Sequence, residues 1–173
     1  MPNHVHNRIE FNSTQEQAYD ILSAIKSENR DFDFEKLIPS PLHMYQADTN
    51  AEDDEDFPCN WHNWRIQNWN TKWNAYNIKT EYVDDICKIE FNTAWSIPYP
   101  IIIAFGNLFK IDFRFVYCEE FDQFYGIEIY KVQENGFIKR TSKRQNKEED
   151  LEMIHEIFGI EKYEEDEIED ETN

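Results

Sequence analysis

Alternating apolar and polar residues predict β-strands along much of the chain. In residues 4–11, Val5, Ile9 and Phe11 share one face, while histidines and charged residues occupy the other. This pattern is typical of a half-buried strand. Similar runs predict further strands at residues 76–82, 86–91, 111–118, 124–132 and 137–141. The Asn135-Gly136 pair is a strong hairpin signal between the last two of them.

Apolar residues at helical spacing predict three helices, at residues 13–27, 96–109 and 147–158. Ser13 and Glu16 form a capping box at the start of the first helix, and Gly159 follows the last as a C-cap. Residues 61–76 contain four of the five tryptophans, and their spacing does not decide between helix and turn.

The order of these elements predicts an α+β, ferredoxin-like fold. Its split β-α-β plan is an antiparallel sheet with two helices on one face. A long insertion at about residues 28–75 interrupts the plan, and an extra C-terminal hairpin and helix follow it. We expect a single domain over residues 1–158, a flexible acidic tail over 159–173, and tryptophans that cover the sheet face left bare by the helices.

Composition agrees with a folded domain inside a cell. The chain has 173 residues, of which 40% are hydrophobic and 16% aromatic, too many for a disordered body. No apolar run approaches the roughly 18 residues of a membrane span, and the first residues do not resemble a secretion signal. Three cysteines do not make a disulfide framework. We therefore expect a host-cell cytoplasmic location, reduced thiols and no membrane partner.

The negative charge is concentrated in two places. The net charge is -19, yet residues 148–173 contain 13 acidic residues against Lys162 alone, and six more acidic residues lie in 48–56. This sign argues against direct nucleic-acid binding, which needs basic residues to neutralise phosphates. It favours a partner with a basic surface. A basic block at residues 139–147 could pair with the tail or contact a phosphate.

Catalytic and metal motifs are missing from the sequence. There is no G-x-S-x-G, P-loop, dinucleotide-binding or H-E-x-x-H pattern, so we expect no enzyme activity and no catalytic residue. A zinc hydrolase built on His4, His6 and His62, with Cys59 near His62, is the least favoured reading. We expect no metal or other cofactor. Asn7 lies on the apolar face of the first strand, where a buried amide must be hydrogen-bonded.

Four stretches resemble a known family. They are MPNHVHNRIEF at the start, FDFEKLIPSP at 32–41, NWNTKWNAY at 68–76 and FNTAWSIPYPII at 91–102. Together they resemble the YubB-type family, ferredoxin-like domain proteins of phages and conjugative plasmids, over about residues 1–132. The resemblance implies the fold and a gene carried on a mobile element, but no enzyme activity or ligand. The acidic stretch at 48–56 and the charged C-terminal end depart from it.

Our leading hypothesis is a non-enzymatic phage or mobile-element protein that binds and inhibits a host defence nucleoprotein complex, for example a CRISPR effector. Acidic residues would occupy a basic nucleic-acid-binding site of that partner. The candidate residues are Asp53, Asp54, Glu55, Asp56, Glu164, Glu165, Asp166 and Glu167. The alternative is a small-ligand or nucleotide-binding module, a sponge for a signalling nucleotide, that uses Trp69, Lys72 and Trp73.

Overall fold

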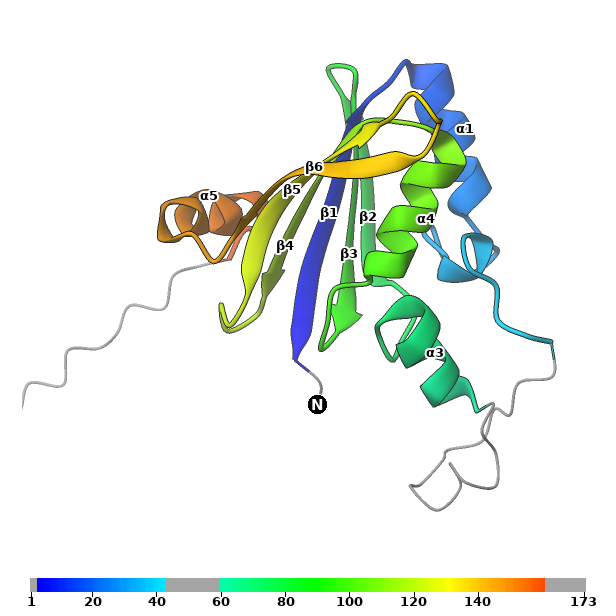
Figure 1. Cartoon of the computed structure of the whole chain (residues 1–173), viewed down its shortest axis with the longest axis horizontal. Coiled ribbons are helices and arrows are strands. Elements are labelled where there is room, and N and C mark those ends of the chain that lie inside the picture. The colour runs from blue at the N-terminus through cyan, green and yellow to red at the C-terminus, as the bar shows by residue number, and fades with distance from the viewer. Residues whose placement is uncertain (1–2, 43–59, 161–173) are drawn as a thin grey trace, which may run out of the picture.

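A computed structural model describes residues 3–42 and 60–160 as a six-stranded antiparallel sheet with helices on both faces (Figure 1). The sheet order is β2-β3-β1-β4-β5-β6. The strands are β1 (His4–Asn12), β2 (Tyr76–Val83), β3 (Ile86–Ala94), β4 (Phe113–Glu119), β5 (Tyr125–Val132) and β6 (Ile138–Gln145). The helices are α1 (Gln15–Ile25), α3 (Trp61–Trp69), α4 (Tyr99–Phe109), α5 (Glu148–Phe158) and a short 3-10 helix, η1 (Phe34–Lys36).

The predicted ferredoxin-like plan is confirmed. Strands β1 to β4 lie in the order β2-β3-β1-β4, and α1 and α4 are the helical crossovers of the two split β-α-β units. The extra hairpin adds β5 and β6 beyond β4, and α5 follows. None of the helices in the described ranges is long and apolar enough to cross a membrane.

The core lies between the sheet and the two crossover helices, α1 and α4. Val5, Ile9 and Phe11 of β1 point into it, as their alternation predicts. Helix α1 contributes Ala18, Ile21 and Ile25, and α4 contributes Ile101, Ile102 and Phe105. Figure 1 shows both helices on the same side of the sheet. Burial of this apolar area is the main stabilising term of the fold.

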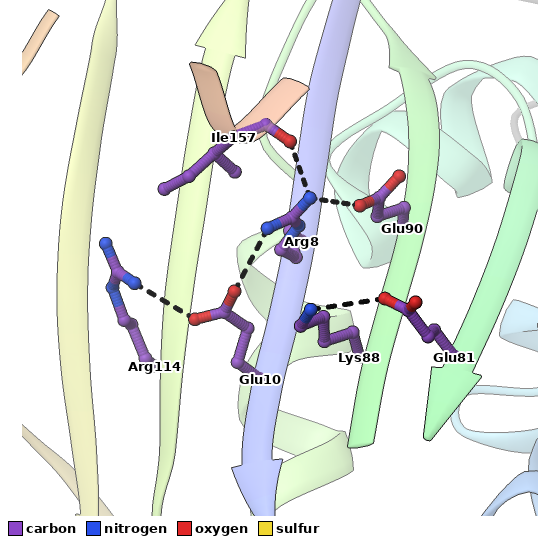
Figure 2. A network of polar contacts seen from close by, with 7 residues as sticks. All are labelled: Arg8, Glu10, Glu81, Lys88, Glu90, Arg114 and Ile157. Carbon is purple, nitrogen blue, oxygen red and sulfur yellow. Dashed lines mark hydrogen bonds and ion pairs between the residues drawn. The ribbon is translucent and has the colours of Figure 1, made fainter. Parts of the chain in front are cut away.

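The opposite face of the sheet carries a charged network beside a smaller apolar cluster (Figure 2). Arg8 at its centre forms ion pairs with Glu10, at 3.2 Å, and with Glu90. Glu10 also accepts a hydrogen bond from Arg114 at 3.0 Å. Arg8 further donates to the main-chain oxygen of Ile157 in the last turn of α5, where helix carbonyls need partners from outside the helix. The network therefore attaches α5 to this face, where Ile154 packs on Val116 and Ile127.

The tryptophans do not cover that face, so this prediction is wrong. Trp64 and Trp69 of α3 pack into the same core as α1 and α4, where Trp69 contacts Phe34 edge to face. The bare face is partly covered by α5, and its exposed remainder is charged. The cover that the face left bare by α1 and α4 requires is supplied by the C-terminal helix α5.

Local boundaries also differ from the predictions. The N-cap of α1 is Thr14, whose hydroxyl accepts a hydrogen bond from the N–H of Gln17. The main-chain N–H of Ser13 donates to the main-chain oxygen of Asp85. Helix α4 begins at Tyr99 rather than 96, with Pro98 as its N-cap, because Ser96 and the oxygen of Ile97 are hydrogen-bonded to Asn70 in the preceding loop. Strand β6 continues past 141 because an edge strand tolerates charged residues.

Gly126 lets β5 pack against both of its neighbours. A Cβ at this position would lie 2.6 Å from the main-chain oxygen of Arg144 and 2.7 Å from the Tyr117 hydroxyl. We expect Gly126→Ala to lower the free energy of unfolding by about 1–3 kcal/mol, since neither a paired strand nor a buried ring can move away. Urea denaturation measures this loss. Ser142→Ala on the exposed edge strand is the control, with a change within about 0.5 kcal/mol; equal midpoints for both variants would contradict the packing argument.

Candidate functional site

Polar side chains join the third and fourth of the family-like stretches. Helix α3 ends at Asn70, a left-handed residue with φ 61°, and its side chain donates to the main-chain oxygen of Ile97 at 2.8 Å. Thr71 is fully buried and makes two hydrogen bonds to Ala94, donating to its oxygen at 3.0 Å and accepting from its N–H at 3.2 Å. The loop after α3 is thus fixed to the loop after β3. The Asn7 amide on β1 donates to the hydroxyl of Thr93 at 3.0 Å, which supports the end of β3 just before that loop.

A second set of hydrogen bonds joins the same loop to the stretch that contains η1. Asn74 accepts from the N–H of Phe34 at 3.0 Å and donates to Asp33 at 2.7 Å. The indole N–H of Trp69 donates to the oxygen of Ile38 at 2.9 Å. Burial alone would raise the pKa of Asp33, but hydrogen bonds from Asn74, Ser27 and the N–H of Glu35 outweigh it and hold that pKa below its ordinary value.

Three aromatic rings gather around one lysine beside these hydrogen bonds. We call this group the aromatic surface: Trp61, Lys72, Trp73 and Trp95. The Lys72 ammonium lies 5.9, 5.7 and 5.4 Å from the ring centroids of Trp61, Trp73 and Trp95. Trp73 is 37% exposed and Trp95 46%. Trp95 also holds a left-handed backbone with φ 66°, which is costly for a bulky residue, and such strained residues cluster at functional sites. The surface therefore presents flat rings and a positive charge to solvent.

A pocket of about 480 Å³ opens beside this surface, a size suited to a small ligand. It is lined by Arg30, Asp33, Glu35, Arg65, Trp73, Asn74 and Tyr76. Both carboxylates already accept hydrogen bonds from the chain, Asp33 from Asn74 and Glu35 from Ser40. Burial raises the pKa of Tyr76 to about 12, so its hydroxyl stays protonated and donates to the oxygen of Thr93.

Arg65 is the cation of this pocket with the least satisfied side chain. Its guanidinium stacks between Trp61, at 5.3 Å, and Trp69, at 4.9 Å. Its Nε is buried with no hydrogen-bond partner among the residues that the structure describes. Burial lowers the pKa of Arg65, in keeping with a cation that has lost water. A bound anion would supply the missing partner.

The predicted site residues fall into two groups. Trp69, Lys72 and Trp73 are neighbours in the structure, but Trp69 is 0% exposed and contributes to the core, while Lys72 and Trp73 lie at the surface. The acidic candidates Asp53–Asp56 and Glu164–Glu167 lie outside the described residues. Their points of attachment are described: the insertion rejoins the chain at Asn60 before α3, and the tail follows Ile160 after α5. Figure 1 shows α3 and α5 on opposite sides of the sheet.

The three histidines considered for metal binding have other neighbours, and the His6 ring lies 5.6 Å from the ring of Phe158 on α5. His4 Nδ1 is hydrogen-bonded to the Tyr76 hydroxyl at 2.6 Å, and His62 Nδ1 is 3.3 Å from the Asn63 side-chain oxygen. Cys59 lies outside the described residues. Within residues 3–42 and 60–160, the one group of three side chains suited to a metal ion is Cys118, Asp122 and His155. The sequence gives no signal for it, because the three residues have no motif spacing.

A buried carboxylate on β5 also has no signature in the sequence. Glu128 on β5 is 0% exposed and accepts hydrogen bonds from the hydroxyls of Tyr99, at 2.8 Å, and Tyr130, at 2.7 Å. Arg140 and Lys143 of β6 lie 3.3 and 3.5 Å from the same carboxylate. Burial raises the pKa of both phenols, so they remain donors. Alternation placed Glu128 in a strand, but only the register of β6 brings the two cations to it.

Comparison with known proteins gives one family match. A family model described as "Ferredoxin-like domain in Api92-like protein" matches residues 68–170, more than half of the chain. The match includes the loop between α3 and β2, strands β2 to β6 and helices α4 and α5. It supports the ferredoxin-like assignment and does not extend to the narrower YubB-type name. No curated protein matches the chain, and no solved structure does.

The lowered pKa of Asp33 predicts a pH-dependent stability. Its carboxylate stabilises the fold above its unfolded pKa of about 4, and this contribution is lost as the pH falls toward the lower folded value. We expect Asp33→Asn to cost about 1–2 kcal/mol at pH 7 and progressively less below pH 4. Urea denaturation from pH 7 to pH 3 measures the difference. Asp31→Asn, an exposed partner of Lys26, should cost under about 0.5 kcal/mol. A difference for Asp33→Asn that does not change with pH would contradict the assignment.

Proposed function

The chain belongs to the family of ferredoxin-like domains in Api92-like proteins, and from this premise we propose that it is a non-enzymatic binding protein of a phage or other mobile element that inhibits a host defence nucleoprotein complex. The resemblance to YubB-type proteins supports the mobile-element origin. The observation that carries the proposal is the distribution of charge. Residues 43–59 and 161–173 have net charges of -6 and -7, which leaves -6 on the other 143 residues.

The basic block of β6 is already engaged within the body, which favours an external partner for the acidic segments. Arg140 and Lys143 pair with Glu128, and Arg144 pairs with Glu149 at 3.2 Å and with Asp150. Three of the five cations that could neutralise the tail therefore have carboxylate partners elsewhere. Lys139 and Lys147 remain exposed. The carboxylates outside the body outnumber the cations left to pair with them.

Carboxylates can replace phosphates in a basic channel because both present oxygen acceptors to Lys and Arg. Clustered charge also speeds association, and this gain falls as salt increases. The two acidic segments join the body on opposite sides of the sheet (Figure 1). We therefore propose that they contact two separate basic surfaces, with the folded body as the spacer between them.

Neutralising the acidic segments tests the proposal. The loop variant carries Asp53→Asn, Asp54→Asn, Glu55→Gln and Asp56→Asn; the tail variant carries Glu164→Gln, Glu165→Gln, Asp166→Asn and Glu167→Gln. With a guide-loaded CRISPR effector as the probe, we expect the wild-type protein to displace labelled target DNA. Each variant should need at least about tenfold more protein for half displacement, because four charges at the contact are lost.

A third variant controls for net charge. It neutralises four exposed carboxylates of the body, Glu16, Asp20, Glu28 and Glu134, and should displace DNA like the wild type. If loop and tail variants match this control, the acidic segments are not the binding surfaces. If the wild-type protein displaces no DNA from the effectors of its host, the proposed inhibition of this class of complex is wrong.

A second candidate function rests on the pocket beside the aromatic surface. Trp73 and Tyr76 could stack a base, and Arg30 and Arg65 could hold its phosphate, since the buried Nε of Arg65 has no hydrogen-bond partner within residues 3–42 and 60–160. These are the requirements of a nucleotide-binding module. In this alternative the protein would sequester a signalling nucleotide and would still perform no chemistry on it.

Tryptophan fluorescence tests the nucleotide alternative. Titration with a panel of mononucleotides and cyclic dinucleotides should give saturable quenching. Trp73→Ala should reduce the affinity about 5- to 100-fold through the lost stacking, and Arg65→Met should reduce it through the lost cation. Trp95→Ala is the control, since Trp95 does not line the pocket. No response at millimolar nucleotide, or equal affinities for the Trp73 and Trp95 variants, would eliminate this site.

A further inference from the structure

Three side chains of metal-binding types converge where α5 packs on the sheet. They come from three different elements: Cys118 from the end of β4, Asp122 from the turn between β4 and β5, and His155 from α5. Their ligand atoms all lie within 4.8 Å of one another. Asp122 Oδ1 is 3.1 Å from Cys118 Sγ and 2.8 Å from His155 Nε2.

These distances fit a tetrahedral ion with little movement. With bonds of roughly 2.0 Å to nitrogen and oxygen and 2.3 Å to sulfur, donor atoms around zinc are separated by roughly 3.3–3.7 Å. The two short contacts need to widen by less than about 1 Å to admit the ion. Thiolate, imidazole and carboxylate together are a donor set that zinc prefers over calcium or magnesium.

The fold holds each donor in place before any ion binds. Glu119 is buried and supports the turn, because its carboxylate accepts from the N–H groups of Phe121 and Gln123 and from the Asn3 amide. This support keeps Asp122 in a left-handed conformation, φ 56°, with its carboxylate toward Cys118. Supporting hydrogen bonds of this kind orient the ligands of metal sites.

His155 is positioned by the packing of α5. It is 8% exposed, and its Nε2, not its Nδ1, faces the other two ligands. The neighbouring Ile154 is fully buried against β4 and β5, and Arg8 holds the end of the helix through the oxygen of Ile157. The imidazole is therefore directed at the group by contacts that do not depend on a metal.

We propose that Cys118, Asp122 and His155 form a zinc site. The Asp122 side chain is 35% exposed, so solvent reaches this side of the group and a water completes the tetrahedron. The ion would link the β4–β5 turn to α5 and so fix the helix from which the acidic tail begins. The proposal is independent of the proposed binding function, since the site lies in the described body and its test needs no partner.

Cobalt substitution tests the site on the full chain. After removal of metal with a chelator, one equivalent of Co²⁺ should produce a near-ultraviolet charge-transfer band from a cobalt-bound thiolate, together with visible bands of a tetrahedral ion. Zn²⁺ should displace it. Cys118→Ser should abolish the charge-transfer band, and Asp122→Asn and His155→Gln should weaken Co²⁺ binding at least tenfold.

Two other cysteines provide matched controls. Cys87→Ser removes a second buried thiol, in the core on the opposite face, and Cys59→Ser removes the thiol near His62. Both variants should keep the band. Loss of the band in Cys59→Ser, its survival in Cys118→Ser, or no band in the wild type would each overturn the proposal. Far-UV circular dichroism shows whether Cys118→Ser is folded; if it is not, the partly exposed Asp122→Asn decides the same question.

Discussion

The position of β1 is the constraint on which the rest of the structure depends. It pairs with β3 on one edge and β4 on the other, so it cannot shift by one residue without exchanging its two faces. One face supplies Val5, Ile9 and Phe11 to the core. The other carries Arg8 and Glu10, which are buried enough by α5 to require charged partners from β3 and β4. A single strand thus specifies an apolar layer and an ionic layer.

The elements of the fold could be predicted because their signals are local. Alternation in residues 4–11, the Asn135-Gly136 turn and the apolar face of α4 each determine their own structure, and the element order then leaves few topologies. The failures involve long-range contacts. Residues 61–69 form a helix whose stability depends on Trp69 packing against Phe34, and nothing in the local spacing reports that contact. The start of α4 depends on two hydrogen bonds with Asn70: the Ser96 hydroxyl donates to the main-chain oxygen of Asn70, and the Asn70 amide donates to the oxygen of Ile97.

The candidate site could be located but not interpreted from sequence. The unusual composition of NWNTKWNAY marks the region, yet the motif has two kinds of residue with opposite roles. Asn70, Thr71 and Asn74 are turned inward to main-chain groups of two other loops, while Lys72 and Trp73 remain at the surface. The two kinds of residue can be distinguished only from the hydrogen-bond partners of the inward side chains, which lie about 20 to 40 residues away along the chain. For the same reason the group of Cys118, Asp122 and His155 has no sequence signature.

The arrangement of α5 connects the ionic face to the proposed function. Arg8 lies beneath the last turn of α5, and without it the helix would lose a charge-assisted hydrogen bond to the main-chain oxygen of Ile157. Ion pairs of Arg144 with Glu149 and Asp150 hold its first turn. Both ends of α5 are therefore held by arginines of the folded body, and these arginines already have partners. Because these arginines already pair with carboxylates of the folded body, they support the proposal that the acidic segments bind a basic partner.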